Sequence, residues 1–316
     1  MRSFKMIDFT KVKTYLPKLD ALKVRKADFA RAPKQKRSFI DFYKSLPNIL
    51  KAKDLRNVVE AVIKAKRNNK PVIFMCGAHV IKCGLNPVII ELIKKQIVTC
   101  LSLNGAGIIH DFEIAYQGRT SEDVAASISN GSFGMNRKTA HFLNQAIARG
   151  VNKGLGIGQA VGEAMAGQRL PYKKLSIIYQ ARRLGIPVTV HVAIGTDVIH
   201  QHPDFNAGLT AEGSLRDFRT LVEIVTRMNQ GGVLLNFGSA VVLPEVFLKA
   251  LNLARNLGFK VKNFSTANFD MIHHYRPTEN IVRRPVLTGG KGYYIIGHHE
   301  ILLPLLAQAV IEKIKR

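Results

Sequence analysis

From Pro71 onward, short apolar segments rich in β-branched residues alternate with amphipathic stretches, and this alternation limits the possible folds more than any other feature. The expected strands are Pro71–Cys76, Ile97–Leu103, Pro187–Ile194, Val233–Phe237, Lys260–Ser265 and Tyr293–Ile296. The expected helices are Asn86–Lys95, Lys138–Arg149, Lys173–Leu184, Leu215–Asn229, Pro244–Leu257 and His299–Ile314. Strands that are apolar almost throughout are buried on both faces. The sequence therefore predicts an α/β fold, a Rossmann-like doubly wound, mostly parallel sheet with helices on both faces.

Basic residues concentrate before residue 70, where 20 Lys and Arg stand against 6 Asp and Glu in a chain of net charge +25. We therefore expect a basic helical N-terminal arm at 1–70 and a Rossmann-like domain at 71–316. Such an arm can contact nucleic acid or another polyanion. It can also be a set of solvated helices, and we favour this reading because the arm lacks RGG-type repeats and basic-aromatic interleaving.

The composition favours a cytoplasmic protein with no membrane segment. No stretch reaches the 18 or more uncharged apolar residues of a membrane span, and the first ten residues carry charges where a signal peptide needs an apolar run. The three cysteines form no disulfide framework. A hydrophobic content of 47% is enough for a sizeable core.

Each expected strand runs into a cluster of small or polar residues. The clusters are Gly77–His79, Asn104–Gly107, Gly195–Asp197, Gly238–Ala240, Thr266–Asn268 and Gly297–Glu300. Ligands of doubly wound sheets bind beyond the carboxyl ends of the strands, and glycines there let a ligand approach the backbone. One such cluster can be a simple tight turn, but six of them together predict a pocket.

The order and spacing of these clusters resemble the deoxyhypusine synthase family. The segments that carry the resemblance are Gly77–Ile93, Asn104–Glu113, Pro187–Asp197, Gly238–Gly258, Phe264–Asp270, Arg276–Glu279 and Gly292–Glu312. The resemblance implies a Rossmann-like NAD-binding domain, in most members part of a homotetramer with active sites at subunit interfaces. Enzymes of this family oxidise spermidine with NAD and pass its aminobutyl group through an active-site lysine to an acceptor amine.

The resemblance also implies which residues contact the cofactor NAD. These are Gly77, Ala78, Asn104, Gly105, Ala106, Asp197, Thr266 and Ala267. The catalytic positions depart from the family: Pro285 stands where the family has its imine-forming lysine, and Leu243-Pro244-Glu245 stands where it has Lys-His-His. Lys291, in a glycine-rich turn, is expected to be a solvated residue. Because proline offers no primary amine, we expect no lysine-imine step.

The sequence then favours an NAD(H)-dependent enzyme that acts on an amine or polyamine-like small molecule by hydride transfer. The candidate bases are His110, His202, His274 and Glu245, while Glu279 and Asp270 are the carboxylates left to hold a cationic substrate. The paired histidines can serve acid–base chemistry or ligand contact, structural roles, or a metal, and we assign no metal site. The alternative is an inactive nucleotide-binding or scaffold protein whose basic arm contacts RNA.

Overall fold

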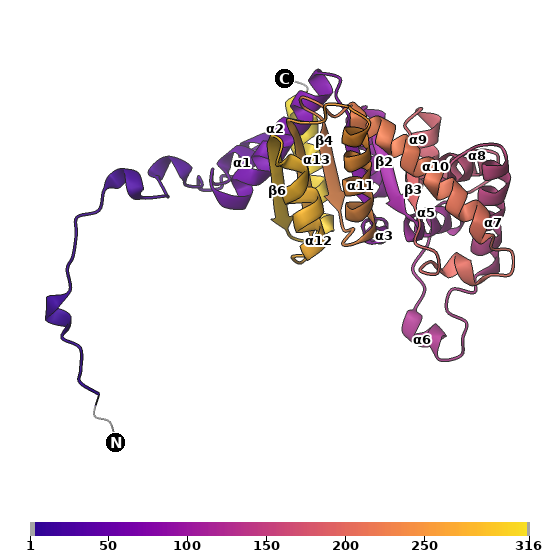
Figure 1. Ribbon diagram of the computed structural model, residues 1–316, viewed down its shortest axis with the longest axis horizontal. Helices are drawn as coiled ribbons and strands as arrows, with labels where there is room; N and C mark the ends of the chain where they lie inside the picture. Colours follow the sequence, from indigo (N-terminus) through magenta and orange to yellow (C-terminus); the bar gives the residue numbers. More distant parts are fainter. Residues whose placement is uncertain (1–3, 315–316) are drawn as a thin grey trace. The chain divides into compact units, whose positions relative to one another are not determined.

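The computed structural model describes residues 4–314, except the side chain of Asp20. Figure 1 shows the parallel sheet at its centre. The sheet has six strands in the order β3-β2-β1-β4-β5-β6. The strands are β1 (Val72–Cys76), β2 (Cys100–Asn104), β3 (Val188–His191), β4 (Val233–Phe237), β5 (Phe264–Asp270) and β6 (Gly290–Ile296). All five strand pairings are parallel, and the expectation of a doubly wound α/β fold is confirmed.

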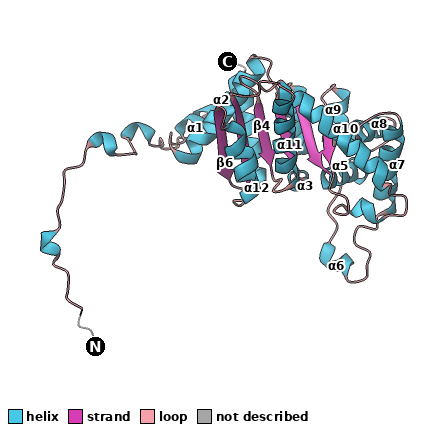
Figure 2. Ribbon diagram, in the orientation of Figure 1, coloured by secondary structure: helices cyan, strands magenta, loops and turns pink. Residues whose placement is uncertain are grey.

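Helices cover both faces of the sheet (Figure 2). The helices after β1 are α3 (Ala78–Lys82), α4 (Asn86–Lys94), α5 (Gly105–Gln117), α6 (Val124–Ile128), α7 (Arg137–Asn152), α8 (Ile157–Ala166), α9 (Ile177–Arg183), α10 (Ala207–Thr226), α11 (Val242–Asn256), α12 (Tyr275–Pro277) and α13 (His299–Ile314). Short 3-10 turns include η5 (Val198–Gln201) and η7 (Arg284–Val286), and η6 (Thr278–Arg283) is a π-helical turn. Within the described residues, no helix is both long and apolar enough to cross a membrane.

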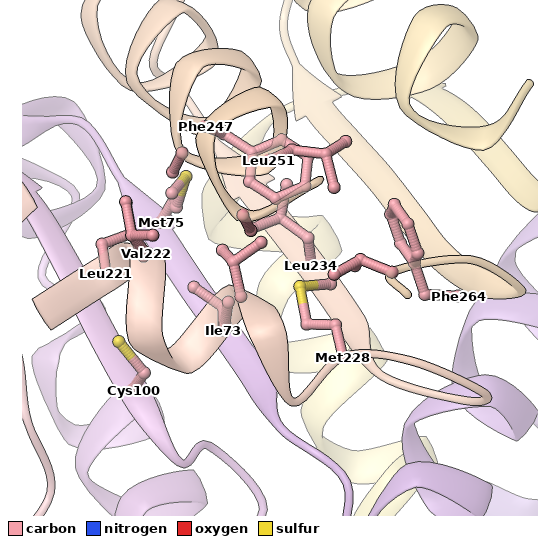
Figure 3. Packing of buried hydrophobic residues seen from close by; sticks show 14 of the residues in the cluster. Ile73, Met75, Cys100, Leu221, Val222, Met228, Leu234, Phe247, Leu251 and Phe264 are labelled. Carbon is pink, nitrogen blue, oxygen red and sulfur yellow. The ribbon is translucent and has the colours of Figure 1, made fainter. Parts of the chain in front are cut away.

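The two faces of the sheet carry different cores. Ile73, Met75 and Leu234 point to the face covered by α10 and α11, where they pack against Leu221 and Phe247 (Figure 3). Successive residues of a strand alternate between faces, so the intervening aromatic residues point the other way. There the Phe237 ring stacks on that of Phe269 at 4.2 Å and lies 5.1 Å from that of Phe74. Both faces of the sheet thus carry buried apolar side chains, as the apolar strands predict.

The chain divides into two compact units between Lys53 and Asp54, ahead of the change in composition near residue 70. In residues 4–38, where a helical arm was expected, the helical structure is limited to three short 3-10 turns, and the first α-helix is α1 (Phe39–Ser45). The helix α2 (Leu50–Arg67) buries Leu55, Val58 and Val62. Parts of the predicted arm and domain, residues 1–3 and 315–316, lie outside the described residues.

One strand prediction is wrong. The expected strand Lys260–Ser265 is mostly irregular, and β5 begins at Phe264 and runs to Asp270. Thr266 and Ala267, expected beyond a strand end, therefore lie inside β5 and are buried. The strand tolerates Thr266 and Asn268 because residues of other elements bond to them: Thr266 Oγ1 donates to the carbonyl oxygen of Ile281, and Asn268 Oδ1 accepts from Asn236 Nδ2.

Candidate functional site at the carboxyl ends of the strands

The strand order places a switch point between β1 and β4, because β1 leads on to β2 on one side while β4 leads to β5 on the other. Gly77 follows β1, Gly238 follows β4, and a Cβ on Gly77 would overlap the carbonyl oxygen of Gly238. Gly238 itself has φ of +62°, and a Cβ there would lie 2.7 Å from His299 Nε2. The two glycines are required for this close approach. We call Gly77, His79, Gly238, Asp270 and His299 the switch-point site.

Two histidines meet at this site from different elements. His79 lies in the first turn of α3 and is exposed, and His299 is the first residue of α13 and is 1% exposed. Their ring centroids are 5.9 Å apart in an edge-on arrangement. Burial lowers the pKa of His299, the nearby Asp270 carboxylate opposing this effect. His299 is therefore a neutral imidazole near pH 7.

The side chain of His299 has an unusual feature for a buried group. Its Nδ1 atom has no hydrogen-bond partner among residues 4–314. Buried polar atoms in proteins are nearly always paired, so an orphan at a strand-end site points to a missing partner. The neighbouring Asp270, at the end of β5, accepts from the backbone N–H of Met271 and lies 3.7 Å from His274 Nε2.

A row of side chains that are polar except for Met75 crosses the sheet just below its carboxyl edge. The residues in register are Thr189, Ser102, Met75, Asn236, Asn268 and Tyr294, one from each strand. Ser102 Oγ and Thr189 Oγ1 are 2.8 Å apart, and Asn236 donates to Asn268 at 2.6 Å. Asn236 Oδ1 and Asn268 Nδ2 have no partner within the described part of the chain. The carboxyl end of an otherwise apolar sheet is thus polar and incompletely satisfied.

The predicted cofactor residues after β2 come together, but they bond to one another. Asn104 Oδ1 accepts from the N–H of Gly107, and the Asp197 carboxylate accepts from the N–H of Ala106. A Cβ on Gly105 would overlap the Asp197 carboxylate. Burial raises the pKa of Asp197 to about 6. The N-terminus of α5, where an anion could bind, is therefore already occupied by side-chain oxygens.

The predicted bases His110 and His202 lie elsewhere and hold the loop between α5 and α7. His110 Nδ1 lies 2.6 Å from Thr120 Oγ1, and His202 Nε2 lies 2.9 Å from the carbonyl oxygen of Gly134. Thr120 also donates to Glu113. Burial acts to raise the pKa of Glu113, but hydrogen bonds from His110 and Thr120 hold it below its ordinary value. The structure does not bring these two histidines to the switch-point site.

Glu245 and Glu279 form one network with cations. Glu245 in the first turn of α11 pairs with Lys249 and Arg276 and accepts from Asn280. Glu279 pairs with Arg283 and Arg284. The hydrogen bond from Lys249 lowers the pKa of Glu245, and that from Arg283 lowers the pKa of Glu279. Both carboxylates are already neutralised within the protein.

Pro285 and Lys291 occupy positions that exclude them from the strand ends. Pro285 is buried in η7. Lys291 is exposed, as predicted, but it does not lie in the predicted turn. It lies near the start of β6, in register with Ser265. With about 3.3 Å per strand residue, it lies about 16 Å before the end of β6 at Ile296. It cannot reach the carboxyl edge of the sheet.

A cavity of about 320 Å³ lies beyond β3, between α10 and α11. His191, Val192, Ser214, Phe218 and Val246 are among the residues that line it. Burial lowers the pKa of His191 to about 3, so this imidazole is neutral and the cavity is largely apolar. Among residues 4–314 no group of three His, Cys, Asp or Glu side chains is arranged to hold a metal ion.

The sequence matches no protein-family model and no curated protein. Among solved structures, the complex of AgrE with ornithine and NAD+ has a TM-score of 0.53 and 16% identity, over 83% of this chain and 33% of AgrE. A provisionally assigned deoxyhypusine synthase from Entamoeba histolytica has a TM-score of 0.53 and 9% identity, over 88% of this chain and 94% of that one. The arginine dihydrolase ArgZ from cyanobacteria has a TM-score of 0.49 and 15% identity.

The chain spans about a third of the length of the AgrE and ArgZ chains it matches. At these identities the likeness defines the fold, a doubly wound parallel sheet. The fold brings His79 and His299 together at the switch point, and neither is one of the bases that the sequence predicts. Their signal was present in the Gly77–His79 and Gly297–Glu300 clusters, but only the strand order shows that these two clusters are neighbours.

Proposed function

We propose that this protein is an NAD(H)-dependent enzyme that acts on an amine or polyamine-like small molecule without a lysine-imine step. The observation that carries the proposal is the strand order β3-β2-β1-β4-β5-β6, the order that binds dinucleotides across the switch point. The fold likeness to AgrE, which was solved with ornithine and NAD+, supports it. Pro285 and the distant Lys291 support the absence of a lysine intermediate.

The residues at the switch point fit a dinucleotide. Gly77 and Gly238 let the turns after β1 and β4 approach each other closely at the switch point, and Ala78 and Ser239 follow them in the chain. The apolar cavity beyond β3 suits a flat ring such as adenine, which leaves the β4–β6 half for the nicotinamide and the substrate. When bound, NAD supplies the hydride acceptor. Asn104, Gly105, Ala106 and Asp197 would shape this site through their mutual contacts.

The substrate half carries a carboxylate suited to an amine. Asp270 is 5% exposed and ends β5, and no Lys or Arg pairs with it within the described residues. Glu245 and Glu279, by contrast, are saturated by cations. A protonated amine is therefore attracted to Asp270 rather than to the other two.

Cofactor binding is tested by thermal unfolding with NAD+, NADH, NADP+ and NADPH. In NAD-binding proteins of this fold an acidic residue binds the ribose 2′-hydroxyl and so selects NAD over NADP. Here β2 ends at Asn104, which is not acidic, so all four nucleotides are tested. We expect stabilisation by at least one of them. Ala78→Glu, which places a carboxylate beside the cofactor phosphates, should abolish it. The matched control Ala126→Glu, on the exposed face of α6, should not.

If none of the four nucleotides stabilises the protein, this proposal loses its basis. The alternative, an inactive nucleotide-binding or scaffold protein, is distinguished by turnover. An enzyme reduces NAD+ when spermidine, L-ornithine or another amine is added, whereas a scaffold protein binds the nucleotide and leaves every amine unchanged.

A further inference from the structure

A basic pocket of about 280 Å³ lies wholly within the first unit, lined by residues of the segment 31–37 and of α1. Four cations line it against the single carboxylate of Asp41. The cations are Arg31, Lys34, Arg37 and Lys44. None of them forms an ion pair within the described part of the chain. The pocket therefore carries positive charge that the protein leaves uncompensated.

An aromatic ring without a stacking partner lies in the same pocket. Phe42 is 50% exposed, whereas the next residue, Tyr43, is buried and stacks on Phe39 with ring centroids 6.2 Å apart. Among residues 4–314 no ring stacks on Phe42. An exposed ring among cations is the arrangement that binds single-stranded nucleic acid, because the ring stacks on a base while the cations bind phosphates.

Backbone and capping hydrogen bonds hold the two walls of the pocket together. The N–H of Arg31 donates to the carbonyl oxygen of Ser45 at 2.9 Å, and that of Asn48 donates to the carbonyl oxygen of Asp28 at 3.0 Å. Ser38 caps α1, and its Oγ donates to the Asp41 carboxylate at 2.8 Å. This bond lowers the pKa of Asp41, so the one carboxylate of the pocket is already bonded within the protein. The ring and the cations thus belong to a folded site.

We propose that this pocket binds single-stranded nucleic acid, with a base stacked on Phe42 and phosphates bound by the four cations. A duplex is a poorer ligand, because its base faces are covered by stacking. A polymer fits better than a free nucleotide, because only four of the 15 Lys and Arg in residues 1–53 line the pocket and the rest extend the positive charge along the chain. The inference is independent of the proposed NAD(H)-dependent function.

The first test places a fluorescent reporter in the pocket of the full-length protein, which has no tryptophan. In Phe42→Trp, a single-stranded oligouridylate should quench the tryptophan fluorescence, because a base stacks on the ring. Phe9→Trp, at an exposed position outside the pocket, is the matched control and should be quenched at most weakly. Inorganic polyphosphate carries charge without bases and should quench neither variant. Quenching that is absent from Phe42→Trp, equal in Phe9→Trp, or equal with polyphosphate would overturn the proposal.

The second test compares equal losses of charge by fluorescence anisotropy with the same oligouridylate. Lys34→Gln with Lys44→Gln removes two cations of the pocket, and Lys13→Gln with Lys18→Gln removes two exposed lysines outside it. The pocket pair should weaken binding by about tenfold or more and lower the slope of log affinity against log salt by about 1.4, the share of two phosphate contacts. The control pair should weaken it by less than about threefold. Equal losses in the two pairs would mean that charge acts without the pocket, and would contradict the proposal.

The third test isolates stacking at a position that tolerates substitution. Phe42→Leu should weaken oligouridylate binding by about fivefold or more, and Phe42→Tyr, which keeps an aromatic ring, should bind like the native protein. Equal affinities of Phe42→Leu and Phe42→Tyr would refute the stacked base. These outcomes are separate from those of the nucleotide tests above, because the switch-point site lies in the second unit.

Discussion

Gly238 and Gly258 both have a positive φ, but only Gly238 is enclosed by other atoms. A Cβ at Gly238 would meet the His299 ring, whereas nothing lies within 4 Å of one at Gly258. Gly258→Ala should therefore lower the free energy of unfolding by about 1 kcal/mol, the cost of the backbone conformation alone. Gly238→Ala should lower it by roughly 1–3 kcal/mol more through overpacking. Urea unfolding measures both, and equal losses would show that the His299 ring moves aside freely.

The buried His191 should make stability depend on pH. Its pKa falls from about 6.5 in the unfolded chain to about 3 in the folded protein, so the folded state binds fewer protons in between. Its stabilising contribution is present above pH 6.5 and is lost as the pH falls. From pH 7 to pH 5 the native protein should lose about 2 kcal/mol that His191→Gln does not lose.

The comparison with a variant isolates this effect. The carboxyls of Asp111, Asp197 and Asp217 have pKa values raised by burial and act in the opposite direction, but they do so in both proteins. Ala126→Gln, at an exposed position without a titratable side chain, serves as the control and should keep the native pH dependence. Parallel curves for the native protein and His191→Gln between pH 5 and 7 would refute the prediction.

At the scale of elements, α8 depends on a cap supplied by α10. Asp217 accepts from the N–H groups of Gly158 and Val190, and the carboxylate sits where a Cβ on Gly156 would lie. Asp217→Ala leaves these donors buried without an acceptor and should cost about 2–4 kcal/mol. Hydrogen exchange should rise first in α8 and β3. Glu212→Ala, which removes a half-exposed ion pair with Arg216, should cost under about 1 kcal/mol.

The elements show where reasoning from sequence succeeds. The mostly apolar segment Val233–Phe237 has the predicted bounds, because no alternative pattern competes with it. The prediction failed at β5, whose Thr266, Asn268 and Asp270 read as a polar loop. These residues belong to a strand because Ile281 and Asn236 bond to the first two. Such partners are distant in sequence, so no local pattern reveals them, and the same holds for the contact of His79 with His299.

At the scale of the whole molecule, the first unit is strongly basic, with 15 Lys and Arg against 4 Asp and Glu in residues 1–53. We expect the full chain to be retained weakly on immobilised RNA at low salt and released steeply as salt rises. Removal of residues 1–53 should reduce this retention. The cut is placed after residue 53 and not after residue 70 because it then spares the buried face of α2.

The same truncation keeps the nucleotide prediction testable. The shortened chain retains the whole sheet, so it should still be stabilised by whichever nucleotide stabilises the full chain. Retention on RNA that is equal with and without residues 1–53 would mean that the remainder of the chain, which is also basic, supplies the contact.

The central position of β1 also sets the order of events during synthesis. The strand β2, which pairs with one edge of β1, is synthesised soon after β1. The strand β4, which pairs with the other edge, begins only at Val233. A ribosome therefore exposes a chain whose middle strand has an open, apolar edge until Phe237 has emerged. Chains arrested before Val233 should aggregate or recruit chaperones, whereas chains released after β6 should not. The architecture that creates the switch point thus leaves the first strand of the sheet paired on one edge only until the fourth strand has been synthesised.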